Sequence, residues 1–572
     1  MPRRVLQHVR PPVTKEGADV LYVKGDAAVG DGGSFVLEKG GVADFSTFFN
    51  MFSLSKWYRY TDIGNLFLEF SCKGKVNVEI IDFSKNDAKT IVVTKADGET
   101  SIAIPVDVKD GMICARFTAL EDSELSGIVF TSDSEQRSLK TCVVTCTYNR
   151  PEAVSDNVDR LLDFIKKCGG EFEKDLGIFV VNNGDMDVPV RRDGTVRIFD
   201  NPNTGGSGGF SRGICEAYAA GYDRVVLMDD DITLDPEAIY RIWSFGSSLT
   251  DPYNNIIMGG TMLRADRPLE IHESTAYFDG LLGVSNDGGL VVSTIDGCLS
   301  FDTGKHSDYN GWWLCSYPRS VANPSNLPLP LFMTWDDAEY GLRCGPDRTV
   351  SLNGVAVWHE PFDLKYSPAR SYYLVRNLCV MHSVHGKGIF ELTRFFFGWT
   401  VPRVFSMRYT DAEVGIRAMR DFLRGPDWLC NADPVELNSS LVDLMPNMIP
   451  YTGDIPSEDE NISRAVRWLT LNGQLLPSRG PCSIMVDSTS SVGTYRASSV
   501  TQIDGRGMCC TVERDVLRSI GILFRTASCC VRSLIVGSGI IRRYRNKFPA
   551  HATELSESNN EQTSPRREIF NR

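Results

Sequence analysis

Three consecutive carboxylates, Asp229, Asp230 and Asp231, follow the mostly apolar run 224–228. Adjacent like charges at the end of a strand repel one another, so the group makes best sense if a divalent cation neutralises it. Oxygen ligands of this kind suit Mg²⁺ or Mn²⁺, and such ions usually accompany a diphosphate. The run therefore predicts a site for a metal-bound nucleotide.

The acidic run is also compatible with a polar loop after a buried strand, and it invites comparison with an EF-hand. The EF-hand interpretation is excluded, because Leu234 occupies the position of the required glycine and Tyr240 occupies the position of the bidentate glutamate. The polar loop stays open until the neighbouring segments are considered.

Polar residues end each strand that the apolar pattern predicts in this part of the chain. The expected strands are 142–147, 178–181, 196–199 and 224–228, and helical patterns alternate with them. Arg150, Asn183 and Asn203 follow the first three strands, and the aspartates follow the fourth. In an α/β sheet, ligands bind at the carboxyl ends of the strands, so four polar ends favour a nucleotide site.

The glycine-rich run 204–212 has two interpretations. Glycines let backbone N–H groups approach a phosphate, but this run lacks the Walker lysine and does not match G-x-G-x-x-G. It predicts either a wall of the donor site or a flexible connector, with a helix from 213 to 220 after it.

Two further segments carry acid–base and ligand side chains. Asp336 and Asp337 stand where a helix begins, so they serve either as N-caps or, for one of them, as a general base toward a sugar hydroxyl. His359 ends the apolar run 355–358 and is either structural or a third metal ligand.

Two aromatic and polar pairs are candidates for contact with a sugar. Trp312 and Trp313 follow glycine rather than a helical pattern, so exposed indoles and buried packing are equally compatible with them. His272 and Glu273 lie in a polar segment that we expect to be a loop, either structural or facing a substrate.

The composition of the 572 residues limits the number of domains and the classes of partner that we expect. A hydrophobic content of 42% supports sizeable cores, and the length predicts several domains. The net charge of −13 argues against a general nucleic-acid surface. No signal-peptide pattern and no uncharged apolar run of about 18 residues is evident, so we expect a cytoplasmic protein.

The pattern predicts four regions along the chain. Regular short β runs predict a β-sandwich or jelly-roll domain over residues 1–135, either sugar-binding or purely structural. An α/β catalytic domain is expected over 136–361, a mainly helical domain over 362–550 and a disordered tail over 551–572.

Taken together, the motifs resemble a known family. The Asp-x-Asp element, Trp335-Asp336-Asp337 and Trp358-His359 are typical of inverting, metal-dependent glycosyltransferases of the GT-A fold. The runs 203–212 and 310–313, with the N-terminal β domain, are similar to the polymerising galactofuranosyltransferases of mycobacterial cell-wall galactan synthesis.

The resemblance implies a UDP-galactofuranose donor, a lipid-linked glycan acceptor and transfer with inversion. It also implies a homotetramer that contacts the inner face of the plasma membrane peripherally. By motif, Asp229, Asp231 and His359 would hold Mn²⁺ or Mg²⁺, and Asp337 would be the base. The donor-binding set would be Arg150, Asn183, Asn203, Asp229 and Asp230. The acceptor-binding set would be His272, Glu273, Trp312, Trp313 and Asp336.

Three rival functions remain at this point. A GT-A transferase using another UDP-sugar for surface polysaccharide would need the same acidic motifs. A nucleotidyltransferase would need basic residues for a triphosphate, and none cluster beside Asp229. A non-catalytic glycan-binding scaffold would not need the acidic motifs. Release of UDP from a UDP-sugar separates the enzymes from the scaffold.

Overall fold

The computed structural model describes residues 3–549 apart from 13–14, 85–87, 107–108, 136, 192–193, 346, 363, 454–461 and 487–492. The tail predicted over 551–572 lies outside these residues. The chain divides into two compact units. The first comprises Met1–Pro202, Gly209–Leu327 and Cys344–Glu360, and the second comprises Asn203–Gly208, Pro328–Arg343 and Pro361–Arg572.

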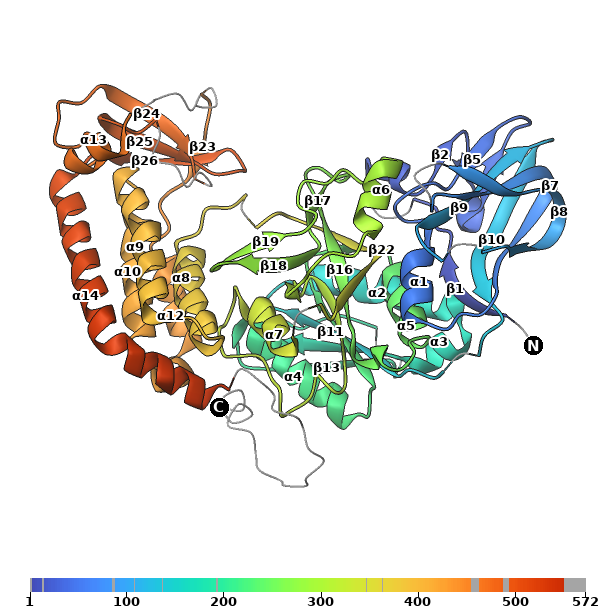
Figure 1. Cartoon of the computed structure of the whole chain (residues 1–572), viewed down its shortest axis with the longest axis horizontal. Helices are drawn as coiled ribbons and strands as arrows, with labels where there is room; N and C mark the ends of the chain where they lie inside the picture. Colours follow the sequence, from blue (N-terminus) through green and yellow to red (C-terminus); the bar gives the residue numbers. More distant parts are fainter. Residues whose placement is uncertain are drawn as a thin grey trace. The chain divides into compact units, whose positions relative to one another are not determined.

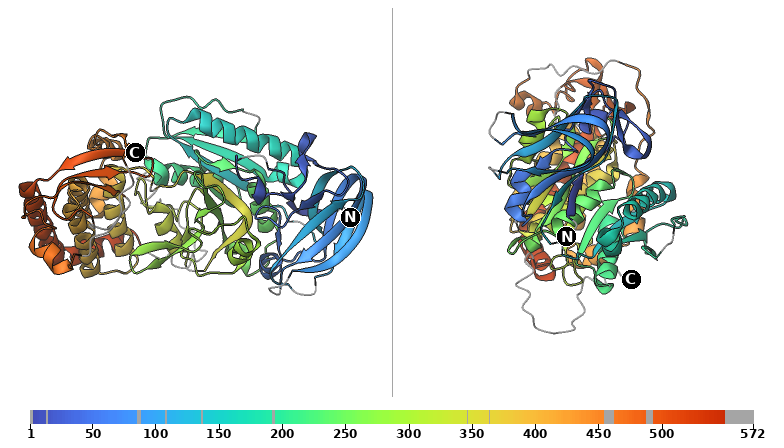
Figure 2. Two further views of the ribbon diagram at one scale, coloured as in Figure 1. Left: turned by 90° about the horizontal axis from the view of Figure 1, so that it is seen from above. Right: turned by 90° about the vertical axis from the view of Figure 1, so that its right-hand side faces the viewer.

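The N-terminal part of the first unit is a ten-stranded sheet, drawn in blue in Figures 1 and 2. Its strands pair antiparallel and curl, which confirms the predicted β domain. They are β1 (Arg4–His8), β2 (Lys24–Gly25), β3 (Ala28–Val29), β4 (Phe35–Leu37), β5 (Val42–Asp44), β6 (Phe52–Ser53), β7 (Leu66–Asp82), β8 (Lys89–Ile104), β9 (Met112–Ala119) and β10 (Ser123–Ser132). Helix α1 (Leu54–Tyr60) follows β6.

The strands β7 and β8 are longer than the sequence pattern indicates. The pattern shows four short runs between residues 66 and 104, but the structure joins them into two strands of 17 and 16 residues. The pairing shifts register between Cys72 and Val76, where Gly74 adopts a φ of +88°. A residue with this backbone conformation forms a bulge, so β7 continues through a position that reads as a turn.

Buried ionic contacts join the N-terminal strand β1 to the catalytic part of the first unit. The Glu237 side chain on α5 (Glu237–Gly246) is fully buried, with His8 Nδ1 2.8 Å from Oε2 and Arg241 Nε 3.2 Å from Oε1. Burial alone raises the pKa of Glu237, but His8, Arg241 and Arg10 outweigh it and lower that pKa. The ionised carboxylate therefore stabilises the packing of β1 on α5.

The catalytic part of the first unit contains a nine-stranded mixed sheet with the order β13-β12-β11-β14-β21-β16-β22-β15, and β17 pairs with β16. The strands are β11 (Thr141–Thr147), β12 (Leu176–Asn182), β13 (Val196–Asp200), β14 (Arg224–Asp229), β15 (Thr233–Leu234), β16 (Ile257–Arg264), β17 (Ile271–Glu273), β21 (Leu314–Pro318) and β22 (Thr349–His359). A small sheet comprises β18 (Thr275–Asp279), β19 (Leu282–Ser285) and β20 (Tyr309–Asn310). The predicted alternation of strands and helices is confirmed.

Helices cover this sheet because each presents an apolar stripe. Val154, Val158, Leu161 and Ile165 of α2 (Pro151–Cys168) are buried in the core, and α2 packs against β11 (Figure 2). The other helices of this part are α3 (Gly170–Asp175), α5, α6 (Ile295–Asp302) and, from Gly209 onward, α4 (Gly205–Ala219).

The strand register brings the predicted polar ends to one edge of the sheet. Thr147 lies opposite Asn182, Asn182 opposite Asp200, and Cys146 opposite Asp229. The antiparallel pairs β14–β21 and β21–β16 and the parallel pair β16–β22 give β22 the same direction as β14. His359 therefore ends its strand at the edge where Asp229 ends β14.

The second unit is mainly helical, as predicted, but it also holds a four-stranded sheet that the sequence pattern does not reveal. The helices are α7 (Asp336–Cys344), α8 (Pro368–Val384), α9 (Ile389–Phe405), α10 (Tyr409–Phe422), α11 (Pro426–Asn431), α12 (Pro434–Val442), α13 (Arg464–Leu469) and α14 (Val516–Lys547). The strands are β23 (Ile449–Pro450), β24 (Gly480–Met485), β25 (Ala497–Ile503) and β26 (Met508–Glu513). These strands are short, and β24 buries one residue only, so alternation is weak in the sequence.

Helix α14 is apolar over much of its length, although the expectation that the chain has no uncharged apolar run of about 18 residues holds for it. Its 32 residues are long and apolar enough to cross a membrane by length and composition, with a mean hydropathy of 1.5 in the most apolar window. The expectation considered only uncharged runs, and Arg525 and Arg532 interrupt this one. Only 28% of that window is buried.

Candidate active site

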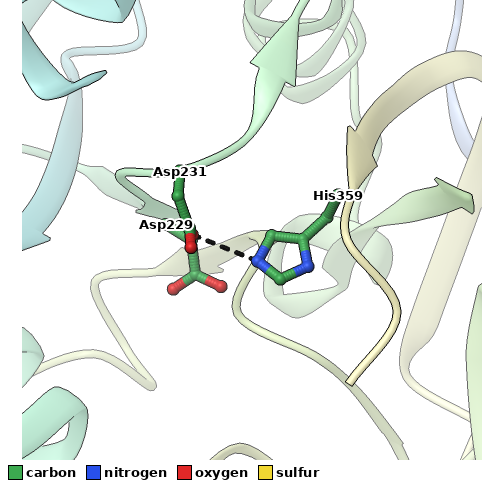
Figure 3. A group of neighbouring side chains, drawn as sticks. All are labelled: Asp229, Asp231 and His359. Carbon is green, nitrogen blue, oxygen red and sulfur yellow. Dashed lines mark hydrogen bonds and ion pairs between the residues drawn. The ribbon is translucent and has the colours of Figure 1, made fainter. Parts of the chain in front are cut away.

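Asp229, Asp231 and His359 come together at the carboxyl edge of the catalytic sheet (Figure 3). Asp229 is the last residue of β14, Asp231 follows it in the turn, and His359 ends β22. One ligand atom from each residue lies within 4.8 Å of the others. The structure thus brings together the three residues predicted as metal ligands.

The hydrogen bonds of His359 orient its ring toward the carboxylates. Nδ1 lies 2.6 Å from the Glu360 carbonyl oxygen and donates to it, so Nε2 points at Asp231 Oδ1, 3.1 Å away. Burial alone lowers the pKa of His359, but the hydrogen bond with Asp231 and the charge of Asp229 outweigh it and raise the pKa. A divalent ion at Nε2 would take the place of this proton.

Arg150 supplies a positive charge to the same carboxylates. Its Nη1 lies 3.3 Å from Asp230 Oδ1 and also donates to Asp231 Oδ2. Burial alone raises the pKa of Asp231, but His359 and Arg150 outweigh it and lower the pKa. Asp230 is 7% exposed, and burial raises its pKa. Asp231 therefore ionises more readily than Asp230 and is better suited to bind a cation. Arg150 is placed to pair with an anionic group of a ligand.

The donor set fits a hard divalent cation. Two carboxylates and one imidazole match the ligand preferences of Mn²⁺ and accommodate Mg²⁺, whereas a soft ion would call for thiolates. The proton on His359 and the guanidinium of Arg150 now stabilise charge that such an ion would neutralise.

Asn157 holds the acidic turn in place and was not predicted. This residue of α2 is 4% exposed, and its Nδ2 donates to the carbonyl oxygens of Asp230 (3.1 Å) and Ile232 (3.0 Å). The only sequence signal is a polar residue on the buried face of an amphipathic helix.

Asn183 lies at the same sheet edge and is buried. Its Oδ1 accepts a hydrogen bond of 2.8 Å from Asn201 Nδ2, and a Cβ on Gly209 would lie 2.8 Å from its Nδ2. Asn201 and Asn182 line a neighbouring cavity of about 470 Å³. Asn183 is therefore placed to shape the edge of this cavity through Asn201.

The glycine-rich run is helical, which corrects its interpretation as a flexible connector, while a role as a wall of the donor site stays a prediction. Helix α4 begins at Gly205, and Asn203 Oδ1 accepts from the Gly205 N–H at 3.2 Å. A Cβ on Gly205 would lie 2.1 Å from the Phe332 carbonyl oxygen, and one on Gly213 would lie 2.1 Å from Val144. The glycines therefore allow close packing around this helix.

Asp336 and Asp337 begin α7 in the second unit, as predicted. Asp336 is buried, whereas Asp337 is half-buried, and its Oδ1 accepts from the Ala338 N–H at 2.7 Å. Glu339, fully buried one turn further, contacts Arg343 Nη2 at 2.8 Å and His385 Nε2 at 3.2 Å. These contacts fix the start of α7.

The segment before α7 is strained. Phe332, Thr334 and Trp335 have φ values of +73°, +66° and +69°, which side chains rarely adopt. The buried amide of Asn377 on α8 donates to the carbonyl oxygens of Leu331 (3.0 Å), Met333 (2.7 Å) and Thr334 (3.0 Å). Asn377 therefore holds the strained segment, and sequence reasoning missed it because only the fold brings it there.

The predicted acceptor residues have a different environment from the one expected. Trp312 and Trp313 are 5% and 3% exposed, so of the two alternatives buried packing is confirmed and exposed indoles are wrong. Trp313 Nε1 donates to the Gly260 carbonyl oxygen at 2.7 Å, and Trp312 Nε1 donates to Tyr317 Oη at 3.0 Å. His272 and Glu273 lie on β17 rather than on a loop, and both are half-buried.

Comparison with family models defines the class of the catalytic part. Residues 142–285 match the model named Glycosyl transferase family 2, and residues 19–125 match Galactofuranosyltransferase 2 N-terminal. The chain therefore combines an α/β glycosyltransferase domain of the GT-A type with a galactofuranosyltransferase-type N-terminal domain.

The particular relatives agree with these domains. The chain is 26% identical over 429 residues to "Galactofuranosyltransferase GlfT2" of Mycolicibacterium smegmatis and 28% identical over 420 residues to that of Mycobacterium tuberculosis. Each alignment covers 67% of this chain, with 64% and 65% of the relatives' own lengths. The resemblance to galactofuranosyltransferases predicted from the sequence is confirmed.

A solved mannosyltransferase gives a weaker structural match. PcManGT from Pyrobaculum calidifontis, in complex with GDP-Man and Mn²⁺, is 12% identical with a TM-score of 0.29. The match covers 54% of this chain and 81% of that chain. The fold assignment rests instead on the strand order and the family models.

Proposed function

We propose that the protein is an inverting galactofuranosyltransferase that moves β-galactofuranosyl units from UDP-galactofuranose to a lipid-linked glycan acceptor. The observation that carries the proposal is the similarity to GlfT2 over 429 residues, together with the two matched domains. The convergence of Asp229, Asp231 and His359 supports it independently, because a nucleotide sugar needs its diphosphate charge neutralised.

Asp229, Asp231 and His359 would hold Mn²⁺ or Mg²⁺. When bound there, the ion stabilises the negative charge that develops on the departing diphosphate. Arg150 contributes a second positive charge beside Asp230 and Asp231, where it can pair with a phosphate oxygen. We propose that Asn183 and Asn203 also contact the nucleotide-sugar donor.

The base in the proposal is Asp337. Its carboxylate takes the proton of an acceptor hydroxyl while that oxygen forms a bond to the anomeric carbon of the donor. The bond from that carbon to the diphosphate oxygen breaks with its electron pair, so the configuration inverts in a single displacement. An ionised carboxylate suffices, since the attacking hydroxyl becomes acidic late in the step.

We propose that His272, Glu273 and Asp336 contact the acceptor glycan. His272 and Glu273 sit on β17, which pairs with the central strand β16, so their positions are rigid. Trp312 and Trp313 would act by packing, because each indole N–H already has a protein acceptor. Their buried rings support the polypeptide near Gly260 and Tyr317.

We further propose that the protein is cytoplasmic and contacts the inner face of the plasma membrane peripherally. We also propose that it forms a homotetramer, as the resemblance implies.

Helix α14 supports the proposed membrane contact. Its buried face carries small or polar residues such as Ser519, Thr526 and Ser533, with Ser533 Oγ 2.6 Å from Thr393 Oγ1. Its exposed face carries large apolar ones, with Leu517 82% and Phe524 75% exposed.

Helix α9 carries aromatic residues both at the surface and in the core. Phe390 is 70% exposed, whereas Phe396 and Trp399 are buried and pack within the second unit. The exposed basic residues Arg532 and Arg542 of α14 would face anionic headgroups, and apolar side chains would enter the interface.

A panel of UDP-sugars tests the proposed class of reaction. The protein is incubated with each donor and a short galactofuranosyl acceptor, and released UDP is measured. Galactofuranose-dependent release that needs the acceptor supports the proposal. Release from another UDP-sugar alone would establish the surface-polysaccharide alternative, and no release from any donor would favour the glycan-binding scaffold.

A further inference from the structure

A second cavity lies at the opposite end of the catalytic sheet from the metal-ligand cluster. It has a volume of about 790 Å³, and Thr349, Val350 and Ser351 at the start of β22 form part of its lining. His359 ends the same strand, and the residues opposite Ser351 and His359 on the partner strand β16 are Gly259 and Arg264. At ~3.3 Å per residue of β16, the cavity therefore begins roughly 17 Å from the cluster. The N-terminal domain contributes other lining residues, including Lys56 and Phe83.

One buried polar group in this lining has unused hydrogen-bonding capacity. Ser351 is 9% exposed, and its Oγ has no hydrogen-bond partner within the part of the chain that the structure describes. Buried hydroxyl groups are normally hydrogen-bonded, so a ligand with hydroxyl groups would supply the missing partner.

The charges of the cavity favour a neutral ligand. Lys56 Nζ lies 3.4 Å from Asp302 Oδ1, and Lys305 Nζ forms an ion pair with Asp287. The described lining residues comprise four cationic and four anionic side chains: Lys56, Arg59, Lys109, Lys305, Asp110, Asp287, Asp302 and Asp347. An anion would meet the aspartates, and a cation would meet the basic residues.

Apolar and aromatic groups line the same cavity. Phe83 and Phe301 are 7% and 3% exposed, and Lys56 Nζ lies 4.7 Å from the centre of the Phe301 ring. Apolar groups beside paired charged groups match a sugar, which presents both C–H and hydroxyl groups.

We propose that this cavity is a second saccharide site that binds a neutral galactofuranosyl segment of the acceptor glycan. The proposal rests on the proposed function for the identity of the sugar. The site would hold part of the glycan chain while its reacting end is at the donor site, so the product would dissociate less often between transfers.

Calorimetric titration of the metal-free protein with a β-galactofuranosyl hexasaccharide, without donor, tests the site. Gly304 lines the cavity, and a Cβ there would meet only Arg59 Nη1, at 3.8 Å. Gly304→Trp therefore places a bulky ring at the lining without displacing packed backbone. Ser351→Ala removes the unpaired hydroxyl without adding bulk.

Both variants should bind the hexasaccharide at least tenfold more weakly, whereas Asp229→Ala should leave this binding unchanged. Val93→Trp, at a 64% exposed position outside the lining, is the matched control and should also bind normally. Equal melting temperatures for the four variants exclude misfolding.

Three outcomes would overturn the inference. These are unchanged binding in Gly304→Trp, loss of binding in Asp229→Ala, and binding of inorganic phosphate in place of the hexasaccharide. A protein that binds the hexasaccharide in this cavity but transfers no galactofuranose would refute the proposed function alone.

Discussion

His359 Nε2 lies 3.1 Å from Asp231 Oδ1 at the ends of two strands that run in the same direction. The contact is between an imidazole that donates through both nitrogens and a carboxylate that is also paired with Arg150. Replacing the Nε2 proton by a divalent ion would leave the carbonyl contact at Nδ1 in place. The same geometry thus serves a protonated and a metal-bound histidine.

Removing either carboxylate ligand should abolish metal-dependent transfer. We expect Asp229→Ala and Asp231→Ala to lower kcat/KM by roughly 10²-fold or more, because several kcal/mol of charge stabilisation is lost. The measurement is turnover with Mn²⁺ titration. Asp159→Ala, which removes a surface carboxylate on α2, is the control. Full activity of the wild type in a chelator would contradict the metal assignment.

Metal affinity should depend on pH through His359. The neighbouring carboxylates raise the pKa of His359 despite its burial, so the metal-free imidazole keeps its proton to a higher pH than an ordinary histidine. Metal binding must displace that proton, so affinity should fall about tenfold per pH unit below the raised pKa and level off above it. Calorimetry with Mn²⁺ over a pH series measures this. A pH-independent affinity across the histidine range would refute this role.

Asp337 should be needed for chemistry rather than for donor binding. Asp337→Asn keeps the size and capping ability of the side chain but removes its basicity, so turnover should fall roughly 10²-fold with UDP affinity unchanged. Asp336→Asn is the comparison at the preceding position, and it should affect use of the acceptor more than the chemical step. If Asp336→Asn is the crippled variant and Asp337→Asn is active, the two roles are reversed.

Asn377 on α8 should support turnover by holding the backbone segment before α7. Its amide holds three carbonyl oxygens of the strained segment before α7, so Asn377→Ala should let that segment relax. We expect kcat to fall about tenfold or more while Mn²⁺ affinity stays normal. Ser383→Ala, on the same helix, is the control. Wild-type turnover in Asn377→Ala would show that the strain has no catalytic role.

The exposed face of α14 should determine membrane association. Phe524→Ser with Ile535→Ser removes two side chains that are each 75% exposed, so flotation with anionic liposomes should be lost. The control is Val435→Ser with Val442→Ser, which removes exposed apolar residues of α12. High salt should weaken the association, since basic residues contribute. A wild-type protein that never floats, even with a lipid-linked acceptor present, would refute membrane contact.

Sequence reasoning located most of the metal-ligand site because strand ends are marked by local patterns. The apolar runs before Asp229 and His359 predict strands, and parallel strands bring their carboxyl ends to one edge. The roles of Asn157 and Asn377 depend on which backbone carbonyls the fold brings near, and no local pattern contains that information.

At the two tryptophans and at the glycines of α4, local sequence patterns predict the wrong environment. Trp312 and Trp313 follow glycine as surface residues often do, yet a Cβ on Gly311 would lie 2.1 Å from the Trp313 ring, so this glycine permits packing. Likewise, the glycines of α4 read as a loop because their helix propensity is low, and tertiary packing overrides that propensity.

The most direct test of the account is the mass of the acceptor after incubation with UDP-galactofuranose, Mn²⁺ and a short galactofuranosyl acceptor. We predict a ladder of products spaced by one hexose, absent with Asp337→Asn and absent when UDP-galactopyranose replaces the donor. An acceptor of unchanged mass with the wild-type protein, or a ladder formed equally well from the pyranose donor, would contradict it.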